Sequence, residues 1–281
     1  MLVLGEQPDI GPVLALRRKL QKSFQSRRVV TKPVAGIGRK LRLHPKLQPI
    51  IEPVLQLVDG GFASHVLVPH PRYLLDYGSL PPALAGAAMC SGLTAYAALD
   101  RLRERAARGP ALLVGMGGVG MMGLALARAL FPHPPIVADT DGRKRDAALA
   151  AGAAAAVDPA DADARKAILA ATGGIYAACD FVGADRSLQF AVGTLARGGK
   201  VVVTGLFGGA FNLPVAMLAL KAITIEGIQT GTLAQAREVL ELLRAGKVPP
   251  VAIAERPLAD AQVTLDDLRA GRIVGRVSLT P

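Results

Sequence analysis

The chain has 281 residues, of which 51% are hydrophobic and 4% aromatic, with no Trp. This length is enough to bury a sizeable core in one large domain or two smaller ones. Its two cysteines, Cys90 and Cys179, cannot form a disulfide framework, and the sequence contains no run of 18 apolar residues of the kind that spans a membrane. We therefore expect a cytoplasmic protein that does not cross a membrane.

The net charge of +11 is unevenly distributed. Residues 1–50 contain 11 Lys or Arg and 2 Asp or Glu, whereas residues 51–281 contain 22 and 20. Nearly all of the basicity therefore lies in the first fifth of the chain, and the rest is close to neutral. This distribution argues against a nucleic-acid-binding protein.

Residues 1–57 form a basic segment that matches no fold pattern. Residues 14–23 could form a short basic amphipathic helix, and the part of the segment that follows it is interrupted by four prolines: Pro33, Pro45, Pro49 and Pro53. The composition leaves three alternatives open: a presequence, an arm that binds nucleic acid or an anionic membrane, and a disordered, solvated arm. We favour the disordered arm.

The pattern changes at Gly60. Residues 62–68 read as a strand, which Pro69 ends. After Pro81 and Pro82, an Ala-rich helix is expected to run to about residue 108, with Cys90 in its first third.

Residues 111–130, ALLVGMGGVGMMGLALARAL, predict a buried strand, a glycine turn and a helix. Gly115 would allow the tight turn, Gly117 the close approach of a pyrophosphate, and Gly120 the close packing of helix on strand. Free N–H groups at the helix start would meet the phosphate charge. The pattern predicts a dinucleotide site with these residues in the turn: Gly115, Gly117, Gly118, Val119 and Gly120. The alternative is a glycine-rich turn without a ligand.

The next apolar run, residues 135–138, ends in Asp139, which lies 19 residues after Gly120. A carboxylate at this spacing hydrogen-bonds the 2′-hydroxyl of the adenine ribose and repels a 2′-phosphate. We therefore expect NAD rather than NADP, although Asp139 could also serve merely to cap the strand end. The adjoining cluster, Arg143, Lys144 and Arg145, could either receive such a phosphate or form a solvated helix face. Asp141 is the predicted N-cap of the next helix.

Strands and helices alternate beyond Asp139. The predicted helices span residues 143–151, 162–171 and 188–196, and the predicted strands span 154–157, 175–182, 200–204 and 223–228. This alternation predicts the α/β class with a doubly wound parallel sheet. In the tail, Thr232 and Gln235 fit a capping box before one helix. A second helix near residues 258–268 and a closing strand at 273–279 complete the chain.

Six stretches carry a specific family resemblance in their order and spacing: DGGFASHVLVPHPRYL, MCSGLTAYAAL, VGMGGVGMMGLALARAL, DFVGADRSL, ARGGKVVVTGLFGG and LRAGRIVGRVSL. Through them, residues 58–281 closely resemble the C-terminal two-thirds of the zinc-type alcohol dehydrogenases of the medium-chain dehydrogenase/reductase superfamily. The resemblance implies a Rossmann doubly wound sheet with an incomplete GroES-like catalytic domain. It divides the chain into an unassigned segment 1–57, a remnant of the catalytic domain 58–92, the Rossmann domain 93–230, and a segment 231–281 that completes the catalytic domain.

The resemblance also implies roles for individual residues. Cys90 corresponds to the last ligand of the catalytic zinc, and a thiolate near a helix start is a suitable ligand. Thr94, one turn later, corresponds to a residue against the nicotinamide. Cys179 corresponds to no ligand and is expected to be a buried strand residue. Gly183, Gly205 and Leu206 correspond to backbone positions around the nicotinamide and its ribose, and Arg276 corresponds to a pyrophosphate-binding arginine. Lys144, from the basic cluster after Asp139, is also expected to bind the cofactor.

The N-terminal region departs from the family. There the family supplies a first cysteine ligand, a His–Glu pair and a Ser or Thr proton relay. Residues 1–57 contain no cysteine and a single histidine, His44. A catalytic zinc keeps three protein ligands and one open position, and this chain offers Cys90. The zinc site is therefore expected to be incomplete.

Three functions are compatible with these features. The first is an NAD(P)-dependent oxidoreductase, assembled as a dimer or tetramer, that transfers hydride between an alcohol or aldehyde and the nicotinamide. The second is a nucleotide-binding remnant without turnover, and the third is a zinc-free, quinone-reductase-like enzyme.

The family resemblance begins abruptly near Val58, where the charge balance also switches. This coincidence suggests that residues 1–57 are an altered or out-of-frame version of the family's N-terminal domain. Reading the upstream DNA in other frames, for a cysteine followed about twenty residues later by a His–Glu pair, would test this hypothesis.

Overall fold

The computed structural model describes Phe62 and residues 74–280, and the latter lie within one compact unit, Val68–Thr280. The predictions for the basic segment 1–57, and for the strand at 62–68 apart from the exposed Phe62, fall outside the described residues.

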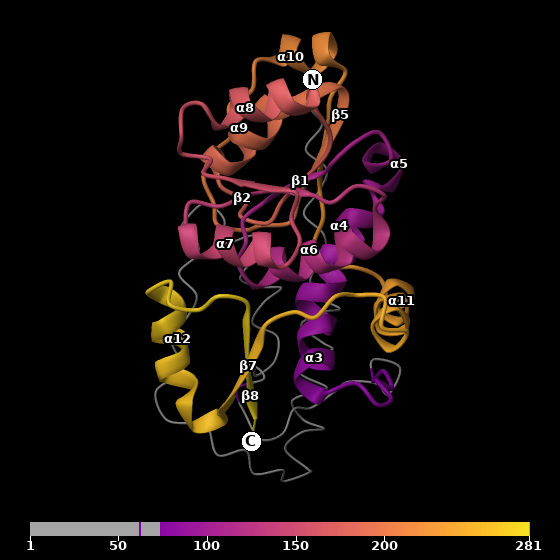
Figure 1. Ribbon diagram of the computed structural model, residues 1–281, viewed down its shortest axis with the longest axis vertical. Helices are drawn as coiled ribbons and strands as arrows, with labels where there is room; N and C mark the ends of the chain where they lie inside the picture. Colours follow the sequence, from indigo (N-terminus) through magenta and orange to yellow (C-terminus); the bar gives the residue numbers. More distant parts are fainter. Residues whose placement is uncertain (1–61, 63–73, 281) are drawn as a thin grey trace, which may run out of the picture. The chain divides into compact units, whose positions relative to one another are not determined.

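A six-stranded parallel sheet forms the centre of this unit, in the order β3-β2-β1-β4-β5-β6 (Figure 1). Its strands are β1 (Leu112–Val114), β2 (Ile136–Ala138), β3 (Ala155–Val157), β4 (Ile175–Asp180), β5 (Leu195–Val203) and β6 (Thr224–Gly227). The chain moves outward in one direction from β1 to β3 and in the other from β4 to β6. Strand order therefore reverses between β1 and β4, which is the switch point of a doubly wound fold. The predicted fold class is confirmed.

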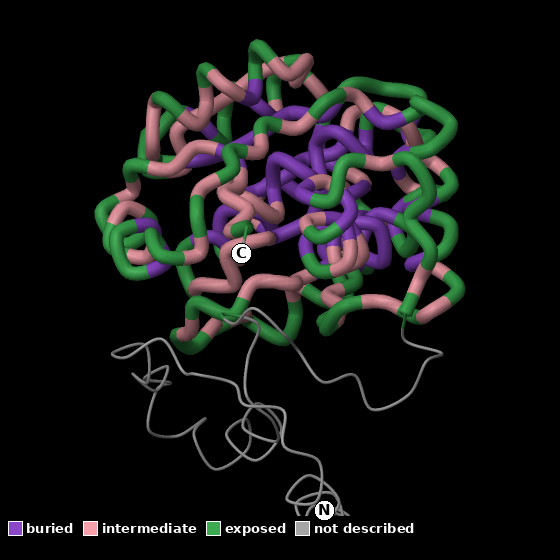
Figure 2. The backbone as a smooth tube through the Cα atoms, turned by 90° about the horizontal axis from the view of Figure 1, so that it is seen from below, coloured by how far each residue is buried: buried purple, intermediate pink, exposed green. Residues whose placement is uncertain are grey.

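Helices cover both faces of the sheet (Figure 1). Leu113 joins one buried cluster with the helix after β1, whereas Leu112 and Val114 join a second cluster with the helices on the opposite face. This division follows from the alternation of side chains along a strand. Figure 2 shows the buried residues gathered in the interior of the unit. The helices are α6 (Gly118–Leu130) and α7 (Gly142–Ala150) on the first face, and α8 (Ala164–Thr172) and α9 (Asp185–Thr194) on the second.

The Ala-rich helix before the sheet is interrupted twice. It consists of α3 (Pro82–Ala87), the π-helical segment η2 (Ala88–Gly92) and α4 (Leu93–Asp100), and a turn at Arg101 separates it from α5 (Arg103–Ala106). By length and composition the run Pro82–Asp100 could cross a membrane, and more than half of it is buried. It packs against α6 and, in the C-terminal segment, against α11 (Leu233–Arg244). Within the described structure it is thus a core helix.

The C-terminal segment contains a second, two-stranded parallel sheet. After α11 come β7 (Ile253–Pro257), the short helix η3 (Leu258–Asp260), α12 (Ala261–Arg269) and β8 (Arg276–Thr280). The predicted capping box is confirmed: the Gln235 N–H donates to Thr232 Oγ1 at 3.2 Å, and the Thr232 N–H donates to Gln235 Oε1 at 3.0 Å. Strand β7 and helix α10 (Val215–Lys221) were not predicted, and β5 begins five residues earlier than expected.

Gly120 allows α6 to approach β1 closely, because it carries no side chain. A Cβ at this position would overlap the carbonyl oxygen of Gly115. We expect Gly120→Ala to lower the free energy of unfolding by about 2–3 kcal/mol, because backbone must move to admit the methyl group. At the exposed Gly86 in α3, a Cβ meets nothing within 4 Å. Gly86→Ala should therefore raise stability by about 0.5–1 kcal/mol through helix propensity. Equal stabilities in urea unfolding would contradict this account of Gly120.

Candidate cofactor site

The glycine turn lies at the carboxyl edge of the sheet. Gly115 follows β1 with φ +90°, and its N–H donates to the Ala138 carbonyl at 2.7 Å. A Cβ at Gly117 would meet no atom within 4 Å. The turn therefore presents uncovered backbone at the position predicted for the pyrophosphate, beyond the ends of the strands where such folds bind ligands.

The N-terminus of α6 has no side-chain cap among the described residues. Gly117 is its N-cap, whereas Asp141 caps α7 and Thr232 caps α11 through side-chain oxygens. An uncapped helix start directs its first N–H groups toward an anion, and the helix dipole adds to the attraction. Arg276 of β8 lies at the same turn, because a Cβ at Gly118 would overlap Arg276 Cδ. The structure thus brings the predicted pyrophosphate arginine to the predicted pyrophosphate turn.

The carboxylate of Asp139 is fixed beside this turn. Its Oδ2 accepts the Met116 N–H at 2.6 Å, and its Oδ1 accepts the Asp141 N–H at 2.9 Å. The residue is 8% exposed. Each oxygen retains accepting capacity for a further donor such as a ribose hydroxyl. Asp139 is therefore more than a strand-end cap, since it links the end of β2 to the glycine turn.

The basic cluster after Asp139 is largely engaged within the chain. Arg143 donates to Asp141 at 2.9 Å and to the Gly271 carbonyl at 2.8 Å. Arg145 donates to the Asp139 carbonyl at 2.7 Å and forms an ion pair with Asp158 at 3.1 Å. The hydrogen bonds from Arg143 hold the pKa of the Asp141 carboxyl below its usual value.

The predicted N-cap is also confirmed here, since Asp141 Oδ1 accepts the Arg143 N–H at 3.0 Å. Lys144 is partly buried, and its side chain makes no ion pair or hydrogen bond within the described part of the chain.

The predicted nicotinamide residues Gly183 and Gly205 lie in direct contact at the ends of β4 and β5. A Cβ at Gly183 would overlap the Gly205 carbonyl, and Gly183 has φ +69°. Leu206, the next residue, is 69% exposed. Cys179 is fully buried in β4, as predicted, and burial raises the pKa of its thiol well above the usual value.

Cys90 is exposed and lies in η2, in the early part of the helical run in which it was predicted. The helical run begins eight residues earlier, at Pro82, and Cys90 is part of its π-helical turn. Thr94 lies one turn later in α4. A Cβ at Gly92 would lie 3.7 Å from Met122 Cγ, so this run packs directly on the helix of the glycine turn.

The donor set does not fit a catalytic zinc. Among residues 74–280 and Phe62, no three His, Cys, Asp or Glu side chains are grouped so that they could hold a metal ion. A catalytic zinc requires three protein ligands, and Cys90 stands alone in this part of the chain. No chemistry in the described residues is therefore assigned to zinc.

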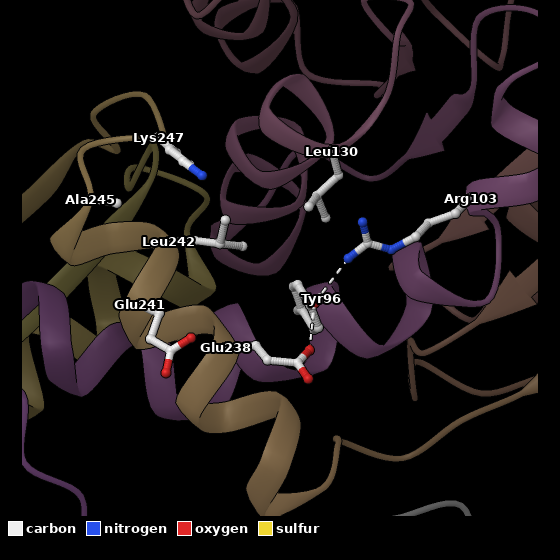
Figure 3. A pocket seen from close by; sticks show the side chains of 8 residues that line it. All are labelled: Tyr96, Arg103, Leu130, Glu238, Glu241, Leu242, Ala245 and Lys247. Atoms are coloured by element: carbon white, nitrogen blue, oxygen red, sulfur yellow. Dashed lines mark hydrogen bonds between the residues drawn. The ribbon is translucent and has the colours of Figure 1, made fainter.

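A separate open pocket lies at the far end of α6 (Figure 3). The Tyr96 hydroxyl donates to Glu238 at 2.6 Å and accepts from Arg103 at 2.9 Å. Burial, followed by the hydrogen bond to Glu238, raises the pKa of Tyr96 to about 12. Because α6 has 13 residues, about 20 Å separates this pocket from the glycine turn. The lining residues are Tyr96, Arg103, Leu130, Glu238, Glu241, Leu242, Ala245 and Lys247.

Sequence reasoning missed one buried group of the candidate site. Asp180, at the end of β4, is fully buried and accepts hydrogen bonds from Gly183 and Ser187. The available signal was an acid at the end of an apolar strand, three residues before a glycine.

The glycine turn, the uncapped helix and the fixed carboxylate together define a Rossmann dinucleotide-binding domain. Residues 118–245 match the family model described as zinc-binding dehydrogenase. Over its C-terminal part, the chain is therefore similar to a segment of the zinc-type alcohol dehydrogenases.

Individual relatives agree with this assignment. An NAD-dependent alcohol dehydrogenase of Sulfurisphaera tokodaii is 29% identical over 79% of the chain and 65% of its own length. A D-arabinose 1-dehydrogenase (NADP(+)) of Saccharolobus solfataricus is 28% identical over 80% of the chain and 66% of its own length. The crystal structure of an alcohol dehydrogenase from Aeropyrum pernix is 28% identical, with a TM-score of 0.65 over 69% of this chain and 57% of that one. The chain thus spans just under two-thirds of the length of these curated relatives.

We predict that the purified chain holds no stoichiometric zinc after dialysis, because its recognised donor set is too small. Metal analysis of the wild type beside Cys90→Ala and Cys179→Ala checks this expectation. Cys179 is a suitable control because its thiol is buried in the sheet. About one tightly held zinc per chain, lost in Cys90→Ala and kept in Cys179→Ala, would refute the prediction.

Proposed function

We propose that this protein binds NAD(H) and is an oxidoreductase of the alcohol dehydrogenase type, acting on a small alcohol or aldehyde. One observation carries the proposal: Asp139 is held against the glycine turn by the 2.6 Å bond from the Met116 N–H. This contact sets a ribose-binding carboxylate and a phosphate-binding turn side by side. The names of the relatives, an NAD-dependent alcohol dehydrogenase among them, support the reaction class.

Each half of the cofactor would contact different residues. The pyrophosphate would bind the N–H groups at the start of α6, with Arg276 neutralising its charge. The adenine ribose would donate its hydroxyls to Asp139, with Lys144 nearby on α7. The backbone of Gly183, Gly205 and Leu206, together with Thr94, would surround the nicotinamide. When bound, that ring supplies the position that accepts or donates hydride.

NAD is the favoured dinucleotide. Asp139 would repel a 2′-phosphate, and the arginines that could receive one already hold other partners: Arg143 binds Asp141 and Gly271, and Arg145 binds Asp158. One relative is named for NADP(+) and another for NAD, so the family name alone does not choose between them. The choice rests on Asp139.

Two other functions remain as alternatives. A nucleotide-binding remnant would bind NAD(H) without turnover, which is favoured by the lack of further metal ligands around Cys90 among residues 74–280. A zinc-free, quinone-reductase-like enzyme would turn over without metal, and Cys90 would then have no role. Metal content distinguishes the alcohol dehydrogenase from the zinc-free, quinone-reductase-like enzyme. Binding of NAD(H) without turnover would identify the remnant. We also propose a cytoplasmic location.

We further propose that the protein is a homo-oligomer. Three side chains near α10 are strongly exposed: Phe207 (84%), Val215 (81%) and Leu220 (68%). No residue of α10 is buried. Strand β6, which follows α10 in the sequence, is at the end of the sheet's strand order. An edge strand and an exposed apolar surface each favour association. A second copy of the chain would cover this surface.

Replacing Asp139 by Ser should weaken NAD binding by about tenfold or more and relatively favour NADP, because a charge-assisted hydrogen bond to the ribose is lost. Isothermal titration with both dinucleotides measures the change. Asp146→Ser, on the exposed surface of α7, removes the same charge nearby and should leave both affinities unchanged. If folded wild-type protein binds neither dinucleotide at millimolar concentration, the proposed function is wrong.

Val215→Lys should convert the oligomer to a monomer, since a charge would be buried at the contact without a partner. Light scattering after gel filtration measures the mass. Val263→Lys is the matched control, because Val263 is also exposed (60%) but lies on α12. A monomeric wild type, or loss of assembly in both variants, would contradict the proposed surface.

A further inference from the structure

Asp180 is a carboxylate buried at the switch point of the sheet. It is the last residue of β4, lies opposite Val114 in the register of β1, and is 0% exposed. Burial raises the pKa of its carboxyl, although the hydrogen bonds that it accepts lower it. A buried acid is costly unless donors surround it, so its partners indicate what it holds in place.

Those partners lie in the turn after β4 and in the first turn of α9. Oδ1 accepts the N–H groups of Val182 at 2.9 Å and Gly183 at 3.1 Å. Oδ2 accepts the Ser187 hydroxyl at 2.8 Å, and the Ser187 Oγ accepts the Ala184 N–H at 3.0 Å. One side chain therefore fixes the path of three consecutive residues, 182–184.

The turn after β4 also fixes the turn after β5. The Phe207 N–H donates to the Val182 carbonyl at 3.1 Å, and the Gly208 N–H donates to the Gly183 carbonyl at 3.0 Å. A Cβ at Gly205 would overlap the Val182 backbone. The two turns therefore have no room to shift independently, and a movement of one is transmitted to the other.

We propose that Asp180 is a positioning residue for the nicotinamide half of the cofactor, acting through the backbone of Gly183 and Gly205. This inference rests on the proposed NAD(H) binding. Because Asp180 is fully buried, it does not touch the cofactor itself. Strand β1 lies between the two strands that end near Asp139 and at Asp180, and the two carboxylates share no hydrogen-bond partner among the described residues. The two acids would therefore serve opposite halves of the dinucleotide.

The test compares two ligands, NADH and ADP, by isothermal titration on the full chain. ADP contains the adenosine and pyrophosphate but lacks the nicotinamide and its ribose. Asp180→Asn replaces the acceptor Oδ2 by an NH₂ donor facing Ser187. We expect its NADH affinity to fall about tenfold, equivalent to about one hydrogen bond, with ADP affinity within about twofold of wild type. Asp139→Asn should weaken both ligands alike.

A milder pair of variants covers the case in which Asp180→Asn does not fold. Ser187→Ala removes the hydroxyl donor to Oδ2 and should lower NADH affinity about threefold, without changing that for ADP. Thr194→Ala is its control, because Thr194 is also buried in α9 but donates to the Ala191 carbonyl at 2.7 Å, away from the turn. It should leave both affinities unchanged.

The ratio of the two affinities separates positioning from general stability, which would alter both ligands equally. Equal losses for NADH and ADP in Asp180→Asn or Ser187→Ala, or no loss for either, would overturn the role of Asp180. A folded wild type that binds ADP but not NADH would overturn the proposed NAD(H) binding itself. A wild type that binds neither would also overturn the proposed function on which the inference rests.

Discussion

The close contact of α6 with β1 is the constraint on which the candidate site depends. Gly120 lies so near the Gly115 carbonyl that no side chain fits between them. The helix consequently starts directly above the strand end, with Gly117 at its N-cap and no side chain to satisfy its first N–H groups. The same approach brings Met116 within hydrogen-bond reach of Asp139. The packing of α6 on β1, the position of the α6 N-terminus and the place of the Asp139 carboxylate therefore all depend on the missing side chain at Gly120.

Local features were predictable from the sequence because their causes lie within a few residues. The glycine turn, the Asp141 cap and the Thr232 capping box each depend on short-range geometry, and all three are present. The doubly wound order followed from the alternation of strands and helices. Cys179 was recognised as a buried strand residue because it stands within a continuous apolar run.

Features that depend on distant partners were missed. Helix α10 buries none of its residues, so it lacks the one-sided apolar stripe by which helices are recognised. Strand β7 has mostly exposed residues and owes its existence to pairing with β8, about twenty residues away. The engagement of Arg143 with Gly271 and the network of Asp180 are likewise tertiary contacts. No periodicity in the sequence predicts these contacts.

The π-helical turn at residues 88–92 has a consequence for how this helix tolerates change. One additional residue in a helical turn rotates everything before it by about 100° relative to everything after it. The π-helical turn therefore sets the direction of the exposed Cys90 relative to the buried run from Ala95 to Leu99. Deleting one residue from this turn would restore a regular α-helix. The Cys90 thiol would then point in a new direction, while the packing of α4 on α6 would stay the same. The direction of an exposed side chain and the packing of the core can thus change independently along one continuous helix.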